Sequence, residues 1–103
     1  MKAHEVIKDP KNWTFHKYAR DAEGDVKDPL GPDATCYCAL GAIGRAYDID
    51  VSELSSFDFY SQCKPAKKLR DWVRANTIHT YVPDWNDKST HAKVYKTLKE
   101  LDI

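Results

Sequence analysis

The sequence has little of several features that mark particular classes of protein. No apolar run approaches the roughly 18 residues of a membrane-spanning helix. The first residues carry no apolar stretch typical of a signal peptide, and there are only three cysteines, so we expect reduced thiols and a place in the cytoplasm. The 16 basic and 16 acidic residues leave no net charge. This balance argues against a nucleic-acid partner, and the lack of a long apolar run argues against a membrane partner.

The composition is sufficient for one folded unit. Hydrophobic residues make up 42% of the chain and aromatic residues 12%. A chain of 103 residues is too short to build a second core. The sequence therefore predicts a single, mainly α domain over residues 1–103, with four to five short helices and at most one small β-hairpin.

Apolar residues recur at helical spacing in several segments, and turn-forming residues separate these segments. The predicted elements, in chain order, are a helix at 3–8, an extended segment at 13–20, a turn with a left-handed Gly24, a helix at 34–47 capped by Asp33, a helical piece opening at Ser52, a helix at 66–75, an irregular stretch at 78–83, and a last helix that follows Asp87 and ends near 101.

The predicted central helix is unusually rich in small residues. Two glycines inside a helix cost about 1 kcal/mol each relative to alanine, and something must offset that cost. A close approach by a neighbouring backbone or ring is the plainest explanation. We therefore interpret Cys38, Gly41 and Ala42 as a structural motif and expect Cys38 to be buried and unreactive.

A thiol enzyme is the alternative interpretation of the same cysteine. Cys38 or Cys36 as nucleophile, His91 as base and Asp87 or Asn86 as orienting group make the right inventory for thiol catalysis. A cap at Asp33 would place Cys38 beyond the first helical turn, where the helix dipole no longer activates a thiol. No catalytic residue is therefore favoured, and an enzyme is the less expected outcome.

Metal binding has weaker support. Cys36 and Cys38 are spaced C-x-C, but no second close pair of ligands accompanies them. We expect no metal and no cofactor.

The sequence Trp85-Asn86-Asp87 is interpreted as the entry to the last helix. Asp87 is expected to cap that helix, and Trp85 to pack back on the core as a hydrophobic staple. His91 shares the inward face of the helix with apolar residues. We expect Trp85, Asp87 and His91 to form one structural unit that docks the C-terminal helix, and we interpret Asn86 as part of the same structural motif.

The segment at 64–74 is basic and surrounds Trp72. Its cations are candidates for binding a nucleic acid or a small anionic nucleotide. The plainer interpretation is a solvated helix face, for which no binding is expected at physiological salt. The candidate binding residues are Lys67, Lys68, Arg70 and Arg74.

Three motifs together resemble a small uncharacterised family found in phages and bacteria. They are residues 19–22 with Gly24, residues 37–43 with Arg45 and Ala46, and residues 85–87 with His91 and Val94. Tyr37 stands where tryptophan is usual in that family. The resemblance implies a mainly helical intracellular domain, encoded by a phage or prophage, and implies no known reaction.

From this resemblance, the small size and the neutral charge, we expect a phage-type protein that binds a host or defence-system protein. The alternatives are a thiol-dependent hydrolase or transferase that uses Cys38 and His91, and a binder of an anionic nucleotide or nucleic acid through residues 64–74.

Overall fold

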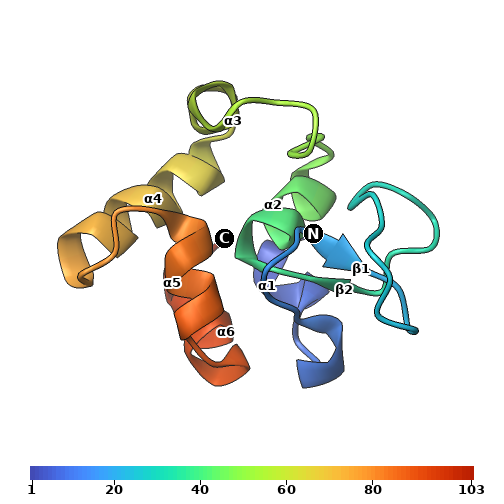
Figure 1. Cartoon of the computed structure of the whole chain (residues 1–103). Helices are drawn as coiled ribbons and strands as arrows, with labels where there is room; N and C mark the ends of the chain where they lie inside the picture. The colour runs from blue at the N-terminus through green and yellow to red at the C-terminus, as the bar shows by residue number, and fades with distance from the viewer.

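Helices account for most of the computed structural model, which describes all 103 residues (Figure 1). The predicted mainly α fold is confirmed, with six α-helices where four to five were expected and one two-stranded antiparallel sheet. The elements are α1 (Ala3–Val6), the 3-10 helix η1 (Pro10–Asn12), β1 (Ala19–Arg20), β2 (Cys36–Tyr37), α2 (Ala39–Tyr47), α3 (Ser56–Gln62), α4 (Lys64–Asn76), α5 (Val82–Lys88) and α6 (His91–Glu100).

Helix α2 is the centre of the core. Its first six residues, 39–44, are all buried, and it packs against α1, α4 and α5. The chain ends meet nearby, because the backbone N–H and ring Nδ1 of His4 both contact the carbonyl oxygen of Ile103, at 3.2 and 2.8 Å. No helix can span a membrane, since the longest, α4, has 13 residues.

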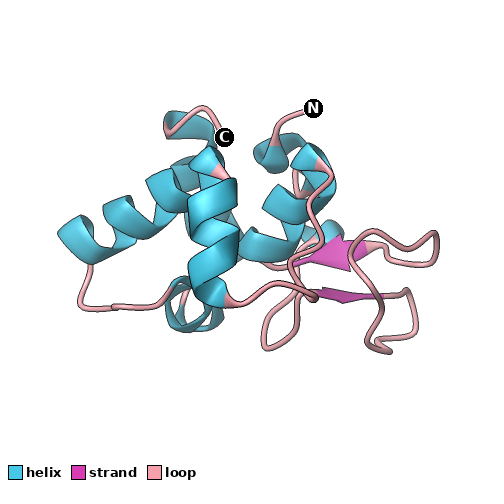
Figure 2. Ribbon diagram, turned by 90° about the horizontal axis from the view of Figure 1, so that it is seen from above, coloured by secondary structure: helices cyan, strands magenta, loops and turns pink.

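The two short strands lie beside the helices, at one end of the molecule (Figure 2). They pair antiparallel, with Ala19 opposite Tyr37 and Arg20 opposite Cys36. The connection between them is long, so they do not form a tight hairpin. A turn closes within the connection, where the backbone N–H of Asp21 donates to the carbonyl of Asp25 at 2.9 Å. The predicted left-handed conformation of Gly24 is confirmed, with φ of 88°.

The prediction of a helix over residues 34–47 capped by Asp33 is wrong at its start. Residues 35–38 instead bond to β1 and to the residue before it: Thr35 N–H donates to the carbonyl of Arg20 at 2.9 Å, and Cys38 N–H to that of Tyr18 at 3.1 Å. These long-range bonds satisfy backbone groups that a helix would otherwise pair locally. Cys38 becomes the N-cap residue of α2.

The helix expected to open at Ser52 begins four residues later, at Ser56. Ser55 caps α3, because its hydroxyl oxygen accepts the N–H of Asp58 at 3.1 Å. Ser52 instead bonds to the Asp50 carboxylate. The helix predicted at 66–75 is confirmed as α4, with Pro65 in its first turn, where a missing N–H costs nothing.

The entry to the last helix also differs from the prediction. Trp85, Asn86 and Asp87 lie inside a separate helix, α5, which starts within the stretch expected to be irregular. Asp87 is not the cap of α6; Thr90 is, and its hydroxyl oxygen accepts the N–H of Lys93 at 3.3 Å. Trp85 is not a staple before that cap. It is buried within α5, with its ring 5.7 Å from that of Trp72.

Candidate functional site

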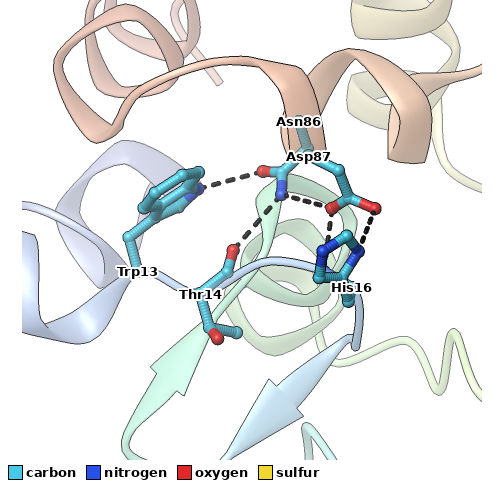
Figure 3. Close-up of polar contacts among 5 residues, drawn as sticks. All are labelled: Trp13, Thr14, His16, Asn86 and Asp87. Atoms are coloured by element: carbon cyan, nitrogen blue, oxygen red, sulfur yellow. Dashed lines mark hydrogen bonds and ion pairs between the residues drawn. The ribbon is translucent and has the colours of Figure 1, made fainter.

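Asn86 joins three segments that are distant in the sequence, and Figure 3 shows its bonds to Trp13 and Thr14. Its Oδ1 accepts the indole N–H of Trp13 and the backbone N–H of Ala39, both at 3.0 Å. Its Nδ2 donates to the carbonyl of Thr14 at 3.2 Å. The residue is 1% exposed, and no buried polar side-chain atom in the chain lacks a partner. Asn86 therefore fixes the N-terminal segment and the start of α2 against α5.

Asp87, the next residue, holds His16 (Figure 3). One carboxylate oxygen accepts the backbone N–H of His16 at 2.8 Å, and the other lies 3.1 Å from its ring Nδ1. His16 has φ of 70°, a left-handed conformation that costs a non-glycine residue about 1–3 kcal/mol. The paired contacts with Asp87 offset this strain and leave Nε2 of the largely exposed ring free of any hydrogen bond to the protein.

A cleft of about 630 Å³ opens beside this pair. Residues 16–18 and 26–29, the segment at 52–53 and the start of α5 form its walls, and Cys38 and Asp87 line it. Its charges are mixed: Lys17 and Lys27 line it together with Asp28, Glu53 and Asp87. The ammonium group of Lys27 lies 3.8 Å from the carboxylate of Asp21, whereas the side chains of Lys17 and Glu53 make no hydrogen bond or ion pair within the chain.

The prediction that Cys38 is buried is confirmed, although its place in the helix differs. Its sulfur accepts the N–H of Gly41 at 3.4 Å as the N-cap of α2, a position that ordinarily favours a thiolate. Burial opposes this and dominates, and the nearby Asp87 carboxylate adds to it, so the pKa of the Cys38 thiol rises from 9.0 to about 11. The thiol is therefore protonated at neutral pH.

The structure separates His91 from the other residues considered for thiol catalysis. Cys38 and Asp87 line one cleft, but His91 does not. The Nε2 of His91 lies 2.6 Å from the carbonyl oxygen of Ile7, and its ring stacks on Tyr95 at 5.8 Å. His16 occupies the position beside Asp87 instead.

His16 and Trp13 were missed as site residues because their contacts with α5 span 71 and 73 residues of sequence. A signal existed in the sequence: the aromatic and polar alternation from Trp13 breaks at His16. Such a break does not indicate which distant residue the side chain at that position will contact.

Gly41 explains the small-residue motif of α2. A Cβ atom at this position would lie 2.0 Å from the carbonyl oxygen of Tyr18. Tyr18 is the residue whose carbonyl also accepts the N–H of Cys38. Ala42 is completely buried. The motif therefore permits the backbone before β1 to cross directly over the start of α2.

The four candidate binding residues of the basic segment each have a partner within the chain. Lys67 and Arg70 pair with Asp71 at 3.6 and 3.3 Å, and Arg70 also lies over the ring of Tyr60. Arg74 Nε donates to the carbonyl of Thr80 at 3.0 Å, and Lys68 donates to that of Leu101.

Cys36 donates its thiol to the Arg20 carbonyl, and no three histidine, cysteine or acidic side chains gather as a metal site.

Comparison with known proteins gives a family but no characterised relative. The model of a family of unknown function, DUF6197, matches residues 1–101. No curated protein and no solved structure matches the chain.

Proposed function

We propose that this chain, which belongs to the DUF6197 family of unknown function, is a small non-enzymatic binding protein that engages a protein partner through the cleft beside His16 and Asp87. The observation that carries the proposal is the cleft itself. Its volume of about 630 Å³ lies within the roughly 300–1,000 Å³ typical of binding sites.

The chemistry of the cleft favours a polypeptide as its occupant. Its mixed charges suit a segment that carries both acidic and basic side chains, whereas a phosphate backbone requires an excess of cations. Val26, which lines the cleft, is 56% exposed, and Phe15, whose ring lies against that of the lining residue His16, is 47% exposed. Exposed apolar side chains among charged residues are typical of a surface that buries them on binding.

The partner that we propose is a host or defence-system protein of a bacterium. The sequence motifs resemble those of small phage and bacterial proteins, which supports this choice. The protonated state of Cys38 supports binding without thiol chemistry.

Charge reversal inside and outside the cleft tests the proposal. We expect the parent protein to capture a specific protein from a lysate of the bacterium that carries the gene or is infected by its phage. Glu53→Lys and Lys17→Glu, which change exposed residues of the cleft, should abolish that capture, because opposed charges now meet the partner.

Glu23→Lys provides the matched control for Glu53→Lys. Glu23 is an exposed residue outside the cleft, and its replacement changes the charge of the protein by the same amount and in the same direction. It should capture the partner as the parent does, when the captured proteins are quantified by mass spectrometry. Equal capture by all four proteins would show that the cleft is not the binding surface.

A thiol-dependent hydrolase or transferase is the second candidate, and one observation favours it. Cys38 caps a helix and lines the same cleft as a histidine that an aspartate orients. This is the arrangement of a nucleophile, a base and an orienting group, with His16 in the place expected for His91.

Thiol labelling separates the two candidates. In a Cys36→Ser, Cys63→Ser variant only Cys38 remains, and we expect it to react very slowly with a thiol reagent at pH 7. A pKa of about 11 leaves roughly one thiolate in ten thousand at that pH. Because only the thiolate reacts, the rate should rise with pH up to about 11. Fast labelling of the native protein at pH 7, at a rate near that of the denatured chain, would favour the enzyme.

A further inference from the structure

A second hollow, of about 390 Å³, lies between the end of α4 and the helices α5 and α6. It shares no lining residue with the cleft beside His16. Trp72 and Trp85 line it, with their rings 5.7 Å apart and inclined at 66°. Trp85 is buried, whereas Trp72 is only half-buried, so the indole of Trp72 is available to a ligand in this hollow.

The hollow is cationic. Lys88, Lys93 and Lys96 line it, against one acidic residue, Glu100. Lys96 lies 3.9 Å from Glu100, but the ammonium groups of Lys88 and Lys93 have no hydrogen bond or ion pair within the chain. This contrasts with the cations of residues 67–74, which are engaged by intramolecular partners.

We propose that this hollow binds a mononucleotide, with the phosphate held by Lys88 and Lys93 and the base packed on Trp72. Unpaired ammonium groups bind phosphate as point charges, and an indole face is a platform on which any base stacks. The volume is in the lower part of the range for small-molecule sites, which suits one nucleotide rather than a polynucleotide.

The three tryptophans provide a local readout of binding. In a titration of ¹⁵N-labelled protein with adenosine monophosphate, the indole N–H signals of Trp72 and Trp85 should shift and saturate. The indole of Trp13 should not shift, because it donates to Asn86 and lies outside the hollow. Absence of a saturable shift at Trp72 and Trp85 at millimolar nucleotide would overturn the proposal.

Lys93→Glu is the decisive variant, because we expect it to stabilise helix α6 while it weakens nucleotide binding. Thr90 caps α6 through the N–H of Lys93, so glutamate at that position completes a capping box. We expect an unchanged or raised melting temperature and a roughly ten-fold or greater loss of nucleotide affinity, since a repelling charge replaces an attracting one.

Lys64→Glu is the matched control: Lys64 is an exposed lysine in the first turn of another helix, outside the hollow. It should leave the affinity within about two-fold of the parent, because its charge is remote from the ligand. Equal losses of nucleotide affinity in Lys93→Glu and Lys64→Glu would show that binding depends only on the net charge of the protein, and would overturn the proposed site.

Inorganic phosphate and adenosine complete the test. Each should bind more weakly than the nucleotide, because each makes only one of the two proposed contacts. If phosphate bound as tightly as the nucleotide, Trp72 would contribute nothing to the affinity. If adenosine bound as tightly, the lysines would contribute nothing. Either result would contradict the proposal.

Discussion

Gly41→Ala is expected to destabilise the fold by about 3–5 kcal/mol, although alanine is the better helix former. The added Cβ would lie 2.0 Å from the carbonyl oxygen of Tyr18, which is backbone and cannot rotate away. Relief would require the segment before β1 to move off α2 and to release the bond from Cys38 N–H to the same carbonyl. Since small domains are stable by about 5–15 kcal/mol, thermal or urea melts should show a large loss.

The effect of helix propensity alone is measured by Ala46→Gly in the same helix, at a half-buried position. That variant should lose about 1 kcal/mol. A Gly41→Ala protein that melts at or above the parent temperature would show that Tyr18 does not cross α2 as described, and that this face of the helix is open.

Asn86→Ala is expected to cost about 3–5 kcal/mol. The amide of Asn86 satisfies the indole N–H of Trp13, the backbone N–H of Ala39 and the carbonyl of Thr14. Its removal leaves these groups unpaired next to a cavity, at about 1–3 kcal/mol for each buried group that water cannot reach. Chemical denaturation of the variant beside the parent gives the change in free energy of unfolding.

Asn76→Ala is the control for that measurement, because Asn76 is an exposed asparagine whose side chain makes one bond, to the carbonyl of Trp72 at 2.9 Å. It should change stability by less than about 1 kcal/mol. Similar small losses in both variants would contradict the role of Asn86 as the joint between the N-terminal segment and α5.

Some of the candidate site was accessible from the sequence. The small residues of α2 required a close neighbour, and the buried state of Cys38 follows from that packing. The sequence also grouped Trp85, Asn86 and Asp87, and the structure shows that Asn86 Oδ1 accepts the backbone N–H of Ala39. Their partners were not accessible, because side-chain spacing along a chain carries no information about residues more than 70 positions away.

Helix α4 and the apolar face of α6 were determined by the sequence alone, since their helical spacing and the proline in the first turn of α4 act within a few residues. Tertiary structure decided the start of α2, the placement of Asp87 and the left-handed His16. At each of these places, a backbone N–H or a carboxylate could form a hydrogen bond either with a residue nearby in the sequence or with a distant one. The bond to the distant residue forms only because packing of the core brings the two segments together.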